Sequence, residues 1–143
     1  MAGIAEILGT DCVLNKEGNK VKIEDICKDK VAVGIYFSAH WCPPCRGFTP
    51  ALAEFYKANN DKFECIFVSS DRDDASFKEY FGEMPWNALP FEERDLKNKV
   101  SEKYGVRGIP TLVILKPDGT VICENGRGDV ASSGNAFPSK WEQ

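Results

Sequence analysis

Hydrophobic and polar residues follow one another along this chain in blocks that predict strands and helices in turn. Two near-continuous apolar runs, residues 31–37 and 63–69, are typical of strands whose two faces are both buried. Residues 111–115 form a third run of this kind. The turn residues 117–119 (Pro-Asp-Gly) follow it, so residues 120–123 are expected to return as an antiparallel strand.

In the segments between these strands, apolar residues recur at the spacing of a helix. Apolar residues recur at Phe48, Leu52, Phe55 and Tyr56, which predicts a helix soon after the first strand. Further helices, each stopped by a glycine, are predicted at residues 74–81 and 96–104.

The order of these elements predicts an α/β fold with a central mixed β-sheet and helices on both of its faces. A length of 143 residues suits one domain, so residues 1–143 are expected to form a single unit. Residues 1–30 form an N-terminal extension, with a short hairpin around residues 17–19 and a small helix near residues 23–27. Residues 126–143, whose start is rich in Gly and Ser, form a tail that either caps the core or is loose.

Charge and apolar content exclude several function classes. The net charge of −4 leaves no basic stripe to neutralise phosphates, so no nucleic-acid partner is expected. No apolar run approaches the ~20 residues needed to cross a bilayer, so no membrane association is expected.

Residues 1–8 lack the basic start and long apolar core of a secretory signal. We therefore expect a reducing compartment, cytoplasmic or nuclear. In such a compartment the four scattered cysteines are expected to be reduced and structural: Cys12, Cys27, Cys65 and Cys123.

The other two cysteines form the tetrad Cys42-Pro43-Pro44-Cys45, which carries the strongest chemical signal. Cys42 is expected where a strand ends and a helix begins. The unpaired N–H groups and the dipole there favour a thiolate, so we expect an exposed sulfur with a pKa below ~8.5. Pro43 and Pro44 suit the first two helical positions. Cys45 lies on the same helical face, within bridging reach. Such a pair exchanges two electrons with a partner disulfide and needs no bound cofactor, since the Cys42–Cys45 disulfide is itself the redox group.

A zinc site is the alternative interpretation of two closely spaced cysteines. Zinc needs four ligands, usually from two such pairs, and there is no second Cys-x-x-Cys here. His40 is the single histidine, and we interpret it as a neighbour of the motif rather than as a ligand. The redox interpretation is therefore favoured, and no metal is expected.

Two prolines raise structural questions. Pro50 falls inside the helix predicted after the motif, which means either a misplaced boundary or a kink; the pattern continues to Tyr56 and favours the kink. Pro110, in Ile109-Pro110-Thr111, is either a plain strand start or a cis-proline. The tripeptide alone does not separate these two.

Several segments together resemble known proteins. Trp41-Cys42 to Cys45 after a buried strand, Pro50 five residues beyond Cys45, and Ile109-Pro110-Thr111 resemble the thioredoxin fold. The match is specific to the nucleoredoxin and tryparedoxin branch and covers about residues 30 to 128. It rests on residues 37–46, Met84-Pro85-Trp86, Leu89-Pro90-Phe91 and residues 105–112.

The resemblance implies roles for residues around the motif. Cys42 would attack a disulfide and Cys45 would resolve the mixed disulfide. Pro110 would be cis, and Ile109 would contact the backbone of the substrate. Trp41 would shield the disulfide and form part of the docking surface, to which Pro43 and Pro44 also belong, whereas Trp86 would pack beneath that surface.

The chain also departs from its relatives. Thioredoxins proper carry a buried aspartate six residues before the first cysteine, where this chain has Tyr36. The base for Cys45 is therefore unassigned, with water or Asp71 as candidates. Arg72 stands where tryparedoxins tend to be acidic, which weakens a preference for the polycationic thiol trypanothione. Arg127 matches an arginine that the family has near its active site. The family's C-terminal Phe-Pro-Trp is Phe-Pro-Ser here, at residues 137–139.

Together these features predict a thiol–disulfide oxidoreductase that reduces protein or peptide disulfides, peroxidases among the substrates. Its electrons would come from a thiol system such as glutathione, trypanothione or a flavin reductase. Two alternatives stay open. One is a redox-sensing interaction module of the nucleoredoxin type with little turnover. The other is an oxidase or isomerase of the secretory pathway, which the lack of a visible signal segment disfavours.

Overall fold

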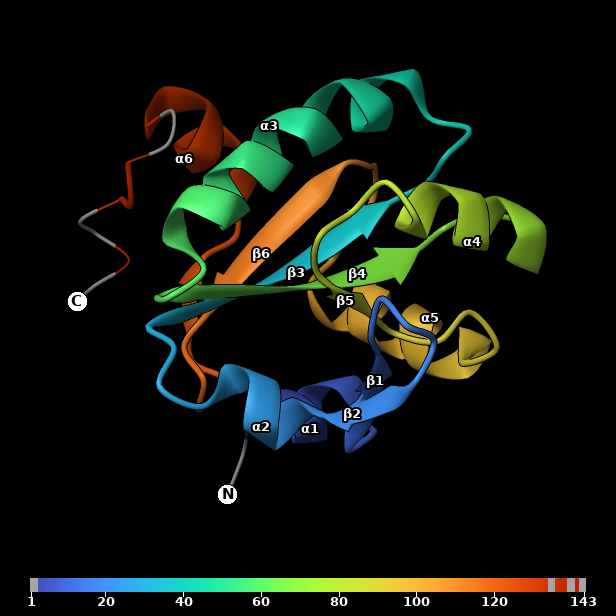
Figure 1. Cartoon of the computed structure of the whole chain (residues 1–143), viewed down its shortest axis with the longest axis horizontal. Coiled ribbons are helices and arrows are strands. Elements are labelled where there is room, and N and C mark those ends of the chain that lie inside the picture. Colours follow the sequence, from blue (N-terminus) through green and yellow to red (C-terminus); the bar gives the residue numbers. More distant parts are fainter. Residues whose placement is uncertain (1–2, 134–135, 139–140, 142–143) are drawn as a thin grey trace.

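A seven-stranded mixed sheet forms the middle layer of the molecule (Figure 1), in a computed structural model that describes residues 3–133, 136–138 and 141. The strand order is β2-β1-β5-β4-β3-β6-β7. At its centre β3 (Ala32–Ser38) runs parallel to β4 (Phe63–Ser69) and antiparallel to β6 (Thr111–Leu115). Every residue of β3 and β4 is buried, because helices cover both faces of the sheet. The predicted α/β class with a mixed sheet is confirmed.

Helices lie on both sides of this sheet, as Figure 1 shows. The upper layer in that view contains α3 (Pro43–Asn59), α4 (Asp74–Phe81) and α6 (Gly126–Ser133). The lower layer contains α1 (Ile4–Leu8), α2 (Ile23–Cys27) and α5 (Arg94–Lys103).

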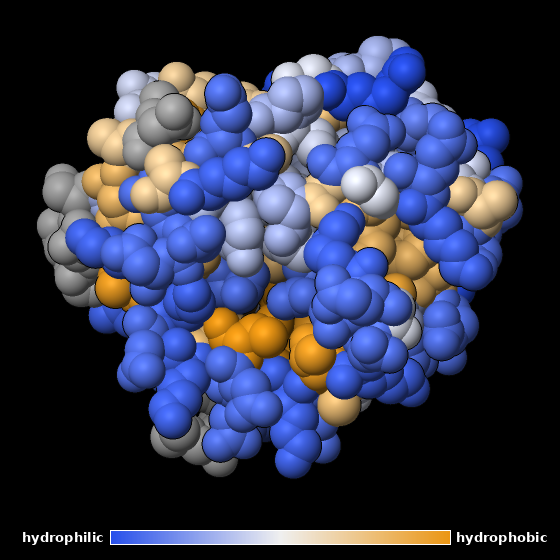
Figure 2. All heavy atoms as spheres, in the orientation of Figure 1, coloured by the Kyte–Doolittle hydropathy of each residue, from blue (hydrophilic) through white to orange (hydrophobic). Residues whose placement is uncertain are grey.

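Each face of the sheet has its own apolar core. Tyr36 and Phe67 pack with the aromatic and aliphatic residues of α3, α4 and α6. Their strand neighbours Ile35 and Ile66 point the other way and pack with α1, α2 and α5. On the face shown in Figure 2 hydrophilic side chains cover most of the surface, and apolar atoms are visible in a hollow near its centre.

Most predicted elements are confirmed, four of them with the predicted bounds: α2, β4, α4 and β6. The hairpin of β1 (Cys12–Leu14) and β2 (Lys20–Lys22) is present, followed by α2. β7 (Val121–Cys123) returns antiparallel to β6 after a turn with Gly119 at φ 95°. α3 continues through Pro50, so the proline is inside the helix, and its kink stays a prediction.

Three elements were not predicted: α1, β5 (Asn87–Ala88) and α6. The first two are five and two residues long, too short to show a period. α6 has little apolar pattern and forms because Val130 is buried against the core. Beyond it the buried Trp141 donates from its ring nitrogen to Asp129 Oδ2 at 2.9 Å. The described part of the tail therefore caps the core; Ser139 of the altered Phe-Pro-Trp motif lies outside the described residues.

Candidate active site

The junction between β3 and α3 positions the two cysteines of the motif. Cys42 is the residue before α3, in an extended conformation with φ −98° and ψ 109°. Pro43 and Pro44 occupy the first two helical positions, as predicted, and both side chains are exposed. The helix starts at once after Cys42, since the Cys42 carbonyl accepts from the Arg46 N–H at 3.1 Å. The Cys42 sulfur therefore sits at the positive end of a 17-residue helix.

The two thiols are reduced and in contact. The Cys45 thiol hydrogen-bonds to the Cys42 side chain, and the Cys42 thiol donates to the Ile109 carbonyl oxygen with 3.7 Å between the sulfur and the oxygen. The prediction of an exposed Cys42 is wrong: Cys42 is 5% exposed and Cys45 0%. The access of Cys42 to solvent is through the groove described below.

Cys45 is held as a neutral thiol. Burial, and then the hydrogen bond with the Cys42 side chain, raise the pKa of Cys45 to about 11, against the opposing effect of hydrogen bonds from Ser38 and the Ala39 backbone. At neutral pH Cys45 is therefore protonated and cannot attack until it loses that proton. A protonated Cys45 suits the role implied for it by the resemblance, in which Cys45 acts second.

A groove of about 420 Å³ opens beside Cys42. Trp41 forms one wall; it is 50% exposed, and its ring nitrogen donates to the Ser70 carbonyl at 3.0 Å. Ile109 also lines the groove, and the Ile109–Pro110 peptide is cis, as the resemblance implied. The residues lining the groove are Trp41, Cys42, Ser70, Lys97, Ser101, Val106, Arg107, Gly108 and Ile109.

Beneath the thiols lies a chain of buried hydroxyl groups that sequence reasoning missed. Ser38 Oγ and the Tyr80 hydroxyl are 2.7 Å apart, and Tyr80 and Thr49 Oγ1 are 2.6 Å apart. Tyr36 joins this chain through Thr49 at 2.7 Å. Thr49 Oγ1 also lies 2.9 Å from the Cys45 carbonyl oxygen, to which it can donate.

Tyr36 is a neutral member of this chain. Burial raises the pKa of Tyr36, so its hydroxyl keeps its proton at neutral pH and cannot replace the missing aspartate as a base. Its ring packs edge-on against Phe48 and Trp86. Trp86 is 1% exposed, in agreement with the core role implied for it.

Asp71 and Arg127 contact groups other than the thiols. The Asp71 carboxylate accepts from the His40 backbone N–H and from the Ser69 hydroxyl, both at 2.7 Å. One carboxylate oxygen of Asp71 therefore holds the backbone next to Trp41, and the other is bonded to Ser69 at the end of β4. The Arg127 guanidinium lies on α6, 5.9 Å from the centre of the Phe48 ring.

The described part of the chain has neither a cluster of metal ligands nor a membrane-spanning helix. There, no three or more His, Cys, Asp or Glu side chains gather so as to hold a metal ion. Within the same residues no helix has both the length and the apolarity needed to cross a membrane.

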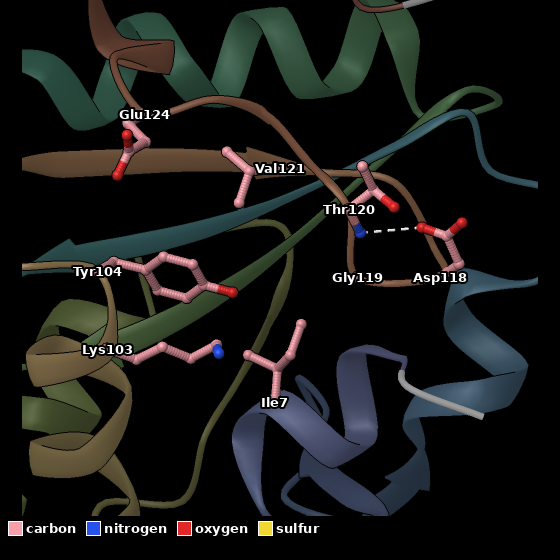
Figure 3. A pocket seen from close by; sticks show the side chains of 8 residues that line it. All are labelled: Ile7, Lys103, Tyr104, Asp118, Gly119, Thr120, Val121 and Glu124. Carbon is pink, nitrogen blue, oxygen red and sulfur yellow. Dashed lines mark hydrogen bonds between the residues drawn. The ribbon is translucent and has the colours of Figure 1, made fainter.

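A second pocket, of about 480 Å³, lies between α1, the end of α5 and the turn from β6 to β7 (Figure 3). Its charges are mixed, from Lys103, Asp118 and Glu124, and Tyr104 points into it. None of its lining residues is a cysteine. Of these two cavities, only the groove beside Trp41 is lined by a cysteine of the motif, Cys42.

Comparison with known proteins gives consistent matches. A family model described as Thioredoxin-like matches residues 30–121. Nucleoredoxin from Bos taurus is 48% identical over 112 residues, which cover 76% of this chain but only 26% of that protein, so the chain spans about a quarter of that relative. Tryparedoxin from Trypanosoma brucei brucei is 39% identical over 145 residues, covering 99% of both chains. A solved structure of tryparedoxin II complexed with glutathionylspermidine has a TM-score of 0.85 and 37% identity, covering 91% of this chain and 92% of that one.

Proposed function

The chain belongs to the thioredoxin-like family, in the branch of the nucleoredoxins and tryparedoxins, and we propose that it is a thiol–disulfide oxidoreductase that reduces protein or peptide disulfides. One observation carries the proposal. The thiols of Cys42 and Cys45 touch each other at the start of α3, beside a groove that leads to solvent. Two adjacent thiols at a helix N-terminus supply both the attacking and the resolving group.

The reaction transfers two electrons in two exchanges. The Cys42 thiolate attacks one sulfur of the substrate disulfide, forms a mixed disulfide and expels the other substrate sulfur as a thiolate. Cys45 then loses its proton and attacks Cys42 Sγ, which releases the second substrate sulfur. The substrate is now a dithiol and the protein holds a Cys42–Cys45 disulfide. A dithiol donor, or two molecules of a monothiol, restores the reduced protein.

The groove walls position the substrate for the first exchange. Trp41 and Ile109 line the groove together with Cys42, and the exposed Pro43 and Pro44 follow Cys42 in the sequence. We assign these residues, with buried Pro110 behind them, to substrate docking. Asp71 supports docking indirectly, because it holds the backbone next to Trp41.

The proposal extends to partners and compartment. Substrates are disulfide-containing proteins, peroxidases among them, and the electron donor is glutathione, trypanothione or a flavin reductase. The match to a tryparedoxin solved with glutathionylspermidine supports a small thiol donor. The dithiol carries both electrons itself, so no bound cofactor or metal is needed, and neither nucleic acid nor membrane is a partner. We assign the protein to the cytoplasm or nucleus, where a reducing thiol pool keeps the cysteines reduced.

Reduction of insulin disulfides with a dithiol donor tests the proposal. Catalytic precipitation of the insulin B chain, many turnovers per protein, is the expected result. The control is Cys42→Ser, which keeps the fold but lacks the attacking sulfur. Stoichiometric oxidation of the dithiol without turnover would instead identify a redox-sensing interaction module.

A further inference from the structure

The groove beside Cys42 is cationic in an acidic protein. The chain has 18 Lys and Arg against 22 Asp and Glu, a net charge of −4. Yet the residues lining the groove include Lys97 and Arg107 and no carboxylate. The pocket of Figure 3 has no such bias, since it contains Lys103 together with Asp118 and Glu124. Of these two cavities, only the one beside Cys42 has an excess of positive charge.

These two cations are available to a ligand. Lys97 is half-buried on α5 and Arg107 is exposed. Neither forms an ion pair with any residue that the structure describes. A cation without a partner at the edge of a partly enclosed groove attracts an anion more strongly than one on an open surface, because less water screens the interaction.

Two further cations strengthen the positive field at the rim. The Arg72 guanidinium lies 5.4 Å from the centre of the Trp41 ring. Arg94, one turn before Lys97 on α5, donates from Nη1 to the Ser69 carbonyl at 3.0 Å. Burial, and then the charge of Arg94, lower the pKa of Lys97, which indicates electrostatic repulsion between the two cations.

Asp71 is the acidic group that faces this cluster. Its charge acts on Arg94, and its two oxygens are already occupied by His40 and Ser69. It therefore offsets Arg94 and leaves Lys97 and Arg107 without a neutralising partner.

We propose that Lys97 and Arg107 determine specificity, and that the groove selects disulfides that carry carboxylates close to the reacting sulfur. This inference rests on the proposed reductase function and names its substrate class. A disulfide held against Cys42 places its neighbouring residues in the groove, whose lining includes both cations. Carboxylates there gain favourable charge interactions, and ammonium groups are repelled. Carboxylates can come from acidic residues of a protein or from the small disulfide of glutathione.

Matched disulfide peptides test the proposal. Three peptides share one cysteine pair and differ only in flanking Glu, Gln or Lys residues; glutathione disulfide is the small-molecule arm. We expect kcat/KM to be ~10-fold higher for the Glu peptide than for the Gln peptide, and lowest for the Lys peptide. The difference should shrink as salt rises from about 0.01 M to about 1 M, where the Debye length falls from ~30 Å to ~3 Å.

Charge-removing variants assign the effect to the two side chains. Lys97→Gln and Arg107→Gln should each lower kcat/KM for the Glu peptide roughly 3-fold more than for the Gln peptide. Lys57→Gln is the matched control. It removes the same charge from the far end of α3, about 22 Å from Cys42 along the helix, where salt screens it.

The outcomes separate this proposal from the proposed function. Equal reduction of all three peptides, or equal losses on the Glu and Gln peptides in both variants, overturns the specificity and leaves the reductase intact. If no peptide is reduced, the reductase proposal fails. In that case, binding of a linear Glu peptide without cysteines, monitored through the chemical shifts of Lys97 and Arg107, tests the preference of the groove for carboxylates. Binding supports this preference, and lack of binding overturns it. A preference for glutathione disulfide over the Glu peptide identifies the small thiol as the source.

Discussion

Cys42 and Cys27 differ in chemistry although simple measures of their surroundings agree. Each is 5% exposed, and each lines a pocket of about 420 Å³. Two further cysteines are fully buried, Cys45 on α3 and Cys65 on β4. Burial and the presence of a cavity therefore do not distinguish a reactive thiol from an inert one.

Helix ends and neighbouring charges do distinguish them. Cys42 precedes the first residue of α3, whereas Cys27 is the last residue of α2, where unpaired carbonyl groups disfavour an anion. The Cys42 groove contains Lys97 and Arg107. The Cys27 pocket is mainly acidic, and its lining includes Glu24, Asp25 and Asp29.

The region around Cys27 suppresses ionisation further. Burial, and then the charge of Glu64, raise the pKa of Cys27 to about 12. The same two causes raise the pKa of Cys65 well above its ordinary value. Glu64 is itself buried, and accepts from the Tyr56 hydroxyl at 3.0 Å and from the Cys65 N–H at 2.9 Å. Cys27 and Cys65 are therefore kept as neutral thiols, whereas Cys42 and Cys45 form the pair that exchanges electrons.

Removing one sulfur from each region gives the largest expected contrast. Cys42→Ser should lower turnover in insulin reduction by more than ~10³-fold, because the attacking sulfur is gone. Cys27→Ser should keep turnover within about 2-fold of wild type. Circular dichroism checks that both variants fold. The comparison breaks if folded Cys27→Ser is as inactive as Cys42→Ser.

Alkylation measures the difference in thiolate content directly. With a pKa of about 12, roughly one Cys27 in 10⁵ is ionised at pH 7, against a few per cent of an unfolded cysteine with a pKa near 8.5. Iodoacetamide should therefore label Cys27 about 10³-fold more slowly in the folded protein than in urea, as read by peptide mass spectrometry. The folded-state rate should rise ~10-fold per pH unit until about pH 12.

The raised pKa of Cys27 also determines how the folding stability of the protein depends on pH. The folded-state pKa of Cys27 is raised from 9.0 to about 12, so its contribution to stability is complete below about pH 9 and is lost as pH rises toward 12. Rapid labelling of Cys27 at pH 7 in the folded protein would contradict the inert assignment.

Within the reactive pair, Cys45→Ser should separate the attack from the resolving step. Turnover should fall by ~10²-fold, while a mixed disulfide between Cys42 and the substrate accumulates, because no internal thiol remains to resolve it. Mass spectrometry of the unreduced complex detects it. Cys65→Ser is the control, since its thiol lies outside the groove. Equal turnover in Cys45→Ser and wild type would rule out the dithiol mechanism.

Much of the fold was predictable because burial on both faces leaves a plain signature. β3, β4 and β6 are continuous or near-continuous apolar runs, with Glu64 as the one charged residue among them. α6 was missed because its cause is tertiary. A Cβ on Gly126 would lie 2.7 Å from Ile114 Cγ1, so this glycine permits close packing of the helix on β6 rather than marking a loose tail.

The site divides in the same way. Cys42, Cys45, Trp41 and Pro110 belong to short motifs that can be recognised one at a time. The groove cations and the buried hydroxyl chain were not predicted, because they bring together residues from separate elements. Ser38 and Tyr80 touch across 42 positions of the sequence, and no local pattern marks either one.

Ser38→Ala should give the smallest effect and sharpens the account of Cys45. Ser38 hydrogen-bonds to the Cys45 thiol and lowers its pKa, opposing burial. The alanine variant should therefore resolve the mixed disulfide roughly 3-fold to 10-fold more slowly at pH 7, while attack by Cys42 is unchanged. Stopped-flow decay of the mixed disulfide across pH measures this, and the decay profile should move to higher pH. Ser132→Ala, at an exposed position of α6, is the matched control. An unmoved profile in Ser38→Ala would show that water alone takes the Cys45 proton.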